Sequence, residues 1–559
     1  MKKQEIMYFV KSFCERKYAS FLFLFLLSFG FMFFFTECVP FFFDDHEFHR
    51  DYIATSYKQL GGQLFSLNHG GISDGPRPVY GLFFKTLFPI LGYDYCYWRI
   101  VKAGIFSLFI ILFYVLSMNI LKKKNVALLS TLFVMTLFPT FLQQFGYNGP
   151  HIFAELFKVS AILLFLYDIE REKTSWMLQI AVFFCSLFAV RVYPPGYSIA
   201  AILPLFTLFY ARKKIMRYLP LFFFIVLIQF PITFQLGALS PDATGTYSLK
   251  SINMVWFLTN DFLQNISNPI PNMSFLYYKS ATAILTFFGF WLLVVCLLIF
   301  IFDFVTKKIE TDHVAEKEKN NDNQGRKRGI ILASVWLLCE VPYYFFLPEH
   351  AVRYSFALFV PFSIATAFFI EEALGRINVE CRKWVSVFFV FVIFGAILTN
   401  VSYTYAFRAG WGSSFIVFEE VMDHMAEQHE KTGKKIGVLY YAGSAADEYK
   451  FVNKSSTNYA FGEGVVYIKS LELNDFSEEG IAFYAAQYDQ FFVLKRTTSV
   501  SKDAHPNIDF AKYGSMKEWI SFEGSSDTFF DNMNGFIMRS VGVSYEPNKV
   551  VTYLYEEKE

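Results

Sequence analysis

Apolar residues in this chain fall in blocks of about 20 residues, separated by polar and charged stretches. A helix of that length can cross the hydrocarbon core of a membrane. The pattern therefore predicts an α-helical polytopic membrane protein with about eleven transmembrane helices. We expect these spans over residues 18–39, 99–121, 125–145, 151–168, 175–190, 196–211, 217–235, 278–304, 329–347, 352–371 and 384–403.

A further apolar stretch, 78–92, is short for a span and contains Pro78, Lys85 and Pro89. It predicts a re-entrant or interfacial segment. The segment 47–60, which precedes it, has apolar residues at helical spacing. That spacing indicates an amphipathic helix on the membrane surface.

Lysine and arginine residues gather on one side of the predicted spans. They follow the second, fourth, sixth, eighth and tenth spans, and so share a side with the basic N-terminal segment. By the positive-inside rule this side is cytoplasmic. We therefore expect a multi-pass protein of the plasma membrane, with its N-terminus inside and the lipid bilayer as its first partner. The net charge of +1 gives no general attraction to nucleic acid, so no nucleic-acid partner is expected.

The composition divides the chain into two domains. Residues 1–403 form the predicted transmembrane domain, which includes a polar cytoplasmic linker over 305–328. Residues 404–559 have the composition of a soluble extracytoplasmic α/β domain, with strands expected at 436–441 and 491–494 and an amphipathic helix over 415–430. The seven cysteines show no CxxC or Cys/His spacing, so a zinc site is not indicated.

The first external loop, 40–98, contains Asp44 and Asp45 where the first span ends. Ionisable groups at a membrane boundary cost free energy and are usually functional. One carboxylate could act as general base on an acceptor hydroxyl or amine, and the other could orient that group or bind Mg²⁺ or Mn²⁺. The alternative is a solvated helix end. Further along the loop, Gly61-Gly62 and Gly70-Gly71 allow tight turns.

Two motifs in this loop resemble the GT-C glycosyltransferases. Asp44-Asp45-His46-Glu47-Phe48 resembles the Asp-Glu-x-x-Phe start of the protein O-mannosyltransferase loop, with Asp45 in the place of Glu. Gly75-Pro76-Arg77-Pro78-Val79-Tyr80-Gly81-Leu82 is similar to the Gly-Arg-Pro-Leu or His-Pro-Pro-Leu segment of that superfamily, which includes aminoarabinose-transferase-like enzymes. The resemblance implies a GT-C-like fold. It also implies transfer of a sugar from a polyprenyl-phosphate-linked donor to an extracytoplasmic glycan, lipid or protein.

The resemblance gives roles to individual residues. It implies Asp44 as general base, with Asp45 placing the acceptor or a metal ion. Arg191, His350 and Arg353 lie in outer loops or at span ends and suit a lipid phosphate, which basic side chains bind through charge-assisted hydrogen bonds. Taken alone, Arg191 could instead be an interfacial anchor, and the other two could belong to a polar turn between helices.

A second set of side chains is predicted to line the substrate site: Arg77, His69, Asp74, Glu155, Lys158 and Tyr193. Glu155 and Lys158 lie one turn apart within a predicted span, where they either form an i,i+3 ion pair or face a cavity. Glu340, in another span, either pairs with a neighbour on its own helix or lines the same cavity.

Other functions fit the same topology. A transporter or flippase of a lipid-linked glycan would have charges within its spans, such as Glu155, Lys158 and Glu340, although the chain shows no internal repeat. A glycan polymerase or ligase also uses lipid-linked donors outside the membrane, but commonly lacks an acidic pair after its first span. A non-catalytic sensor with an external domain is a further alternative.

Overall fold

The structure is a computed structural model, and it describes residues 19–35, 55–65, 78–91, 95–136, 150–192, 194–235, 328–340, 356–376, 427–442, 459–461, 466–470, 486, 488–498, 515–523 and 549–556. The chain divides into two compact units. The described residues up to 376 belong to the first unit, which is helical. Those from 427 onward belong to the second, which contains a β-sheet.

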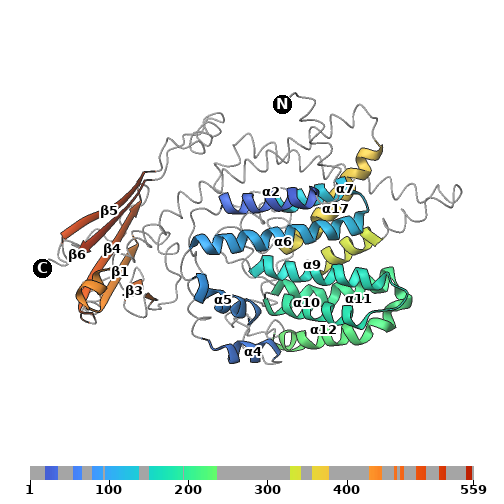
Figure 1. Ribbon diagram of the computed structural model, residues 1–559, viewed down its shortest axis with the longest axis horizontal. Helices are drawn as coiled ribbons and strands as arrows, with labels where there is room; N and C mark the ends of the chain where they lie inside the picture. The colour runs from blue at the N-terminus through green and yellow to red at the C-terminus, as the bar shows by residue number, and fades with distance from the viewer. Residues whose placement is uncertain are drawn as a thin grey trace, which may run out of the picture. The chain divides into compact units, whose positions relative to one another are not determined.

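Helices, most of them apolar, lie side by side in the first unit (Figure 1). They are α2 (Ala19–Phe35), α4 (Tyr57–Phe65), α5 (Pro78–Leu91), α6 (Tyr95–Leu121), α7 (Lys124–Thr136), α9 (Pro150–Ile169), α10 (Trp176–Val192), α11 (Ile199–Tyr210), α12 (Ile215–Gln235) and α17 (Phe356–Arg376), with a further helix over 328–340. Two short 3₁₀ helices, η1 (Pro194–Ser198) and η2 (Arg212–Lys214), connect α10 to α11 and α11 to α12.

The predicted α-helical class is confirmed for the described part of this unit. Each predicted span that begins before residue 220 contains a helix, as do those at 329–347 and 352–371. The predicted spans at 278–304 and 384–403 and the linker 305–328 lie outside the described residues. Within the described residues, Tyr97–Leu121 is long and apolar enough to cross a membrane, with a mean hydropathy of 2.3, and the other apolar helices are shorter. The number of membrane crossings therefore stays a prediction.

Contacts between the helices define two ends of the helical unit. At one end, Arg99 Nε of α6 donates to the carbonyl oxygen of Phe33 in α2 at 2.6 Å. At the other end, a guanidinium nitrogen of Arg328 donates to Asn119 Oδ1, near the end of α6, at 2.8 Å. Arg328 also pairs there with Glu170, which directly follows α9. We call these the Arg99 end and the Arg328 end.

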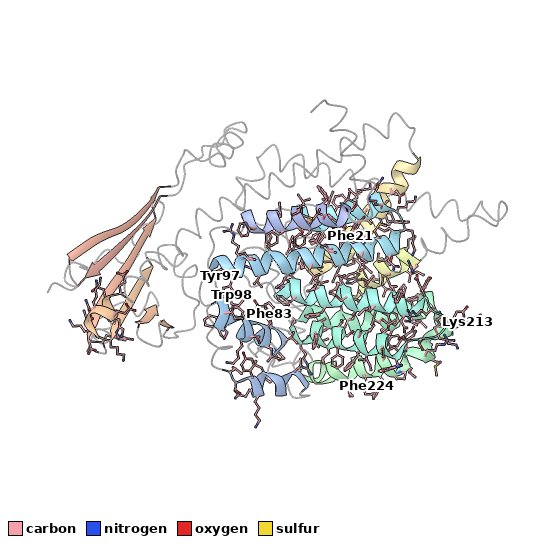
Figure 2. The ribbon with its side chains drawn as sticks, viewed as in Figure 1. Phe21, Phe83, Tyr97, Trp98, Lys213 and Phe224 are labelled. Carbon is pink, nitrogen blue, oxygen red and sulfur yellow. The ribbon has the colours of Figure 1, made fainter. Side chains whose placement is uncertain are left out.

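The basic loops share the Arg328 end. Lys123 pairs with Glu371 of α17 at 2.5 Å, and Lys214 donates to the carbonyl oxygen of Ile169 at 2.6 Å. Figure 2 shows the labelled Lys213 at this end of the bundle. The prediction that these loops lie on one side is thus met where the structure describes them, and their cytoplasmic location stays a prediction.

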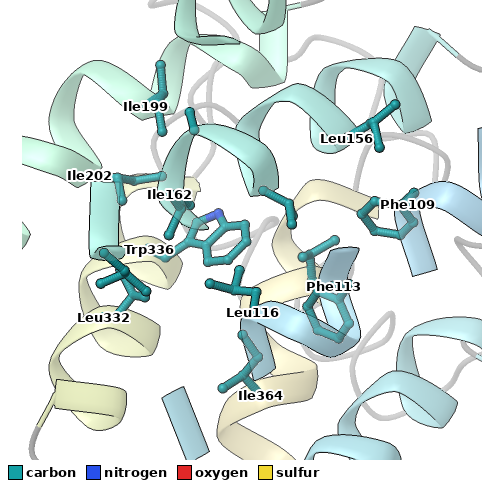
Figure 3. Packing of buried hydrophobic residues seen from close by; sticks show 14 of the residues in the cluster. Phe109, Phe113, Leu116, Leu156, Ile162, Ile199, Ile202, Leu332, Trp336 and Ile364 are labelled. Carbon is teal, nitrogen blue, oxygen red and sulfur yellow. The ribbon is translucent and has the colours of Figure 1, made fainter. Parts of the chain in front are cut away.

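The helices pack around an apolar core and also expose a large apolar surface. Phe109, Phe113, Ile162, Trp336 and Ile364 are buried together (Figure 3). Water-soluble proteins rarely expose extensive apolar patches, whereas membrane proteins present them to lipid. The exposed apolar side chains here include Phe23, Leu26, Leu108, Met177, Ile180, Phe209, Met216, Phe223 and Phe224.

Helix α4 begins with a capping box. Ser56 Oγ accepts a hydrogen bond from the Gln59 amide at 3.2 Å, and Gln59 Oε1 accepts one from the Ser56 amide at 3.0 Å. The helix continues through Gly61 and Gly62, so this pair, which would allow a tight turn, lies within a helix. Each glycine costs a helix about 1 kcal/mol, which the cap offsets in part. The predicted surface helix over 47–60 is described only from residue 55.

The second unit contains a mixed six-stranded sheet in the order β2-β3-β1-β4-β6-β5. Its strands are β1 (Ile436–Ala442), β2 (Tyr459–Phe461), β3 (Val466–Ser470), β4 (Gln490–Thr498), β5 (Ser515–Glu523) and β6 (Lys549–Glu556). Strand β1 pairs in parallel with β3 and β4, and the other pairs are antiparallel. The strands predicted at 436–441 and 491–494 lie within β1 and β4. The predicted helix over 415–430 is described from 427, where the chain is helical.

Candidate functional site

Three charged side chains meet in the interior of the helical unit. Lys158 Nζ of α9 lies 2.5 Å from Glu155 Oε1 on the same helix and 2.5 Å from Glu340 Oε1 on the helix over 328–340. Ser198, the last residue of η1, accepts a hydrogen bond from Lys158 at 3.2 Å and donates one to Glu340 Oε1 at 2.7 Å. Trp336 Nε1 donates to the same carboxylate oxygen at 2.9 Å. We call these five residues the buried charge cluster.

The cluster is closed to solvent. The side chains of Glu155 and Lys158 are 0% exposed and that of Glu340 is 1% exposed. Glu340 Oε1 receives three donors, whereas its Oε2 and Glu155 Oε2 have no hydrogen-bond partner among the described residues. Two carboxylates face one ammonium group, so the cluster carries a net charge of −1 when every group is ionised. Groups buried in this way persist in membrane helices when they serve a function or a specific pairing.

The cluster lies toward the Arg99 end. Glu155 is the sixth residue of α9, about 7.5 Å along the axis from the start of the helix at a rise of 1.5 Å per residue. Helix α9 finishes at the Arg328 end, where Asp168 accepts hydrogen bonds from the Ser175 amide at 2.8 Å and the Tyr218 hydroxyl at 3.1 Å. The start of α9, and the buried His151 in its first turn, therefore belong to the Arg99 end.

Arg191 lies at the same end, in the last turn of α10, and its side chain is buried. The helix η1 packs against α10 at this turn. A Cβ atom on Gly196 would lie 2.1 Å from the carbonyl oxygen of Ala189, so only glycine fits there. The turn that carries Arg191 and the segment that reaches the buried charge cluster are thus packed on each other.

Helix α5, at the end of the first external loop, packs against the same region. Tyr80 and Phe83 of α5 contact Phe153 of α9, with ring centroids 5.6 and 4.7 Å apart. Phe84 stacks on Trp98 of α6 at 4.3 Å. Figure 2 shows Phe83 and Trp98 together at this end. Helix α5, in the last part of the predicted loop 40–98, therefore packs against the helix that carries Glu155 and Lys158.

Of the predicted site residues, the structure brings Glu155 and Lys158 into contact and places Arg191 at the same end. The remaining candidates lie outside the described residues: Asp44, Asp45, His69, Asp74, Arg77, Tyr193, His350 and Arg353. Their approach to the cluster, and a metal ion at Asp45, stay predictions. Among the described residues, no three His, Cys, Asp or Glu side chains are grouped in a way that could hold a metal ion.

Two residues of the site, and one contact at the Arg328 end, were not predicted from the sequence. Ser198 and Trp336 were not singled out, because a hydroxyl and an indole in apolar helices are ordinary core residues. Trp336 does lie four residues before Glu340, and that spacing could have indicated the pair. The contact between Asp168 and Tyr218 was also missed, although a lone acidic residue at the end of an apolar run was a usable signal.

Comparison with known proteins gives one structural similarity of note. No family model matches the chain, and no curated protein matches it. Among solved structures, ArnT from Cupriavidus metallidurans bound to undecaprenyl phosphate is similar over 96% of this chain and 98% of that chain, at 10% identity and a TM-score of 0.45. At that identity and TM-score the similarity carries no argument about function, which depends on the residues of this chain.

Proposed function

We propose that this chain is a membrane glycosyltransferase that moves a sugar from a polyprenyl-phosphate-linked donor to an extracytoplasmic acceptor. The observation that carries the proposal is the buried cationic side chain of Arg191 at the Arg99 end of the helical unit. Helix α2 finishes at this end, and the chain reaches Asp44 nine residues later. The proposal takes Asp44 and Arg191 to act on one substrate.

The chemistry divides between the carboxylates and the basic residues. Asp44 takes a proton from the acceptor hydroxyl or amine, whose oxygen or nitrogen then bonds to the anomeric carbon of the sugar. The bond from that carbon to the phosphate oxygen breaks, and polyprenyl phosphate leaves. Arg191, with His350 and Arg353, stabilises the negative charge that develops on the phosphate. Asp45 orients the acceptor or holds Mg²⁺ or Mn²⁺.

Other predicted residues complete this proposal. Arg77 braces the loop or contacts the donor, and His69, Asp74 and Tyr193 line the substrate site. The C-terminal domain, 404–559, recognises a glycan, lipid or protein acceptor outside the plasma membrane.

A transporter or flippase is the second candidate, and one observation favours it. Lys158 sits between Glu155 and Glu340 in the helical core, where buried charges commonly mark a path for ions or substrate. The acidic pair at Asp44-Asp45 has no role in that function.

Purified protein in lipid vesicles separates the two candidates. The probes are polyprenyl phosphates that carry radiolabelled hexoses or pentoses, added with membrane extracts as acceptor. A glycosyltransferase moves label from the lipid to an acceptor. Movement of intact lipid-linked sugar across the bilayer, with no label transferred, would overturn the proposal in favour of a flippase.

A further inference from the structure

The buried charge cluster has no reacting group of the proposed mechanism in it, yet it is tied to the segment beside Arg191. Residue Ser198 makes this connection, because its hydroxyl contacts both Lys158 and Glu340. The same 3₁₀ helix, η1, contacts α10, which carries Arg191 in its last turn. This short helix therefore joins the cluster to the turn with the predicted phosphate-binding side chain.

The backbone of η1 also packs on α10. Gly196 packs so tightly against α10 that an added Cβ would meet Ala189 and Val190, the two residues before Arg191. A movement of η1 would consequently move the last turn of α10. Because Glu340 Oε1 is held by three donors, Ser198 is anchored to a group that is itself fixed.

We propose that Ser198 is a positioning residue, which holds η1 on the buried charge cluster and thereby fixes the direction of the Arg191 guanidinium toward the lipid phosphate. The inference rests on the proposed function, since it takes Arg191 as the phosphate-binding group. In this proposal Lys158 and Glu340 act through Ser198, and this positioning role takes the place of the substrate-lining role that the sequence predicts for Lys158. Fixed side chains bind a ligand more tightly because less rotational freedom is lost on binding.

The test measures the dissociation constant of radiolabelled polyprenyl phosphate for the full-length protein in detergent. Ser198→Ala removes the hydroxyl and its hydrogen bonds to Lys158 and Glu340, and it is expected to weaken binding of polyprenyl phosphate about tenfold. Ser198→Thr, which keeps the hydroxyl, is expected to restore most of the affinity. The matched control is Ser186→Ala, which removes another buried hydroxyl, from α10, that donates to Val182 within the helix. It is expected to bind like the wild type.

A double-mutant cycle shows whether Ser198 acts through Arg191. Arg191→Ala should itself weaken binding, and Ser198→Ala should then add nothing in that background. If Ser198→Ala weakens binding by the same factor with and without Arg191, the positioning role is overturned while the proposed function stands. If Arg191→Ala binds like the wild type, the proposed phosphate site fails first. Should Ser198→Ala not fold, Trp336→Phe removes one anchor of Glu340 and takes its place in the same cycle.

Discussion

Lys158 Nζ lies 2.5 Å from Glu340 Oε1, although the two residues are 182 positions apart in the chain. The ammonium group also contacts Glu155, so a single cation serves two carboxylates in the core of the helical unit. The cluster therefore has one cationic group and two carboxyl groups. Loss of the cation leaves two like charges together, whereas loss of one carboxylate leaves a neutral pair.

This unequal number of charged groups predicts that two substitutions in the cluster lower the free energy of unfolding by different amounts. Lys158→Met leaves Glu155 and Glu340 uncompensated and is expected to lower the free energy of unfolding by about 3–5 kcal/mol. Glu340→Gln is expected to cost about 1 kcal/mol, because the amide oxygen still accepts from Trp336 and Ser198. Denaturant unfolding in detergent gives both values. A larger cost for Glu340→Gln would contradict this account of the cluster.

The packing of η1 on α10 is predicted to require glycine at position 196. Gly196→Ala would place a methyl group 2.1 Å from the Ala189 carbonyl oxygen, so η1 and α10 must separate. The thermal unfolding temperature should fall by several degrees, as expected for a loss of a few kcal/mol. Gly104→Ala in α6 is the control, because no atom lies within 4 Å of the added group and alanine favours helix. Equal unfolding temperatures for the two variants would contradict the close approach.

The regular elements of this fold follow from the sequence more readily than the contacts between them. Apolar runs of about 20 residues predict most of the described helices, and the contact of Glu155 with Lys158 follows from a one-turn spacing. Nothing in the sequence pairs Lys158 with Glu340, since helical periodicity says which face is apolar and not which helix it meets. Glu340 was expected either to pair within its helix or to line a cavity. It bonds to Trp336 on its own helix and to Lys158 across the core.

The helix through Gly61-Gly62 has a local cause. Glycine permits a turn without requiring one, and the capping box of Ser56 and Gln59 starts a helix just before the pair. For the candidate site, the sequence named Arg191 from its position at the end of a span. It could not show that η1 packs on that turn, because the contact depends on Gly196 and Ala189 lying face to face.

At the Arg328 end, the bond between Tyr218 and Asp168 is predicted to stabilise the junction of α9, α10 and α12. Tyr218→Phe removes the hydroxyl that donates to Asp168 Oδ2 at 3.1 Å and is expected to cost about 1–3 kcal/mol. The comparison is Tyr114→Phe, a buried tyrosine whose hydroxyl makes no hydrogen bond to the described residues. If both variants unfold at the same denaturant concentration, the contact contributes no stability.

Lys122 ends α6 in a left-handed conformation, with φ of 59°. Lys122→Gly is expected to stabilise the protein by about 1 kcal/mol, because glycine adopts this conformation without a steric penalty. Lys122→Ala keeps the penalty and separates it from the effect of charge. An equal stability of the glycine and alanine variants in thermal unfolding would contradict the backbone explanation.

The charge of Lys122 should make a pH-dependent contribution to stability. Burial, with the nearby Arg328, lowers the pKa of Lys122 below its usual 10.5. The folded state therefore binds this proton less tightly than the unfolded state, and the charged amine opposes folding at neutral pH. That opposition should weaken as the pH rises through the lowered pKa, and it should be absent in Lys122→Ala. An identical pH dependence in the wild type and Lys122→Ala would contradict it.

The most direct test of the proposed glycosyl transfer is the rate at which Asp44→Asn moves radiolabelled sugar from polyprenyl phosphate to an acceptor in vesicles. Asparagine has nearly the same shape but cannot take a proton from the acceptor, so the rate should fall by a factor of about 10² or more, while the affinity for polyprenyl phosphate stays close to that of the wild type. Transfer by Asp44→Asn at the wild-type rate would contradict the assignment of Asp44 as general base.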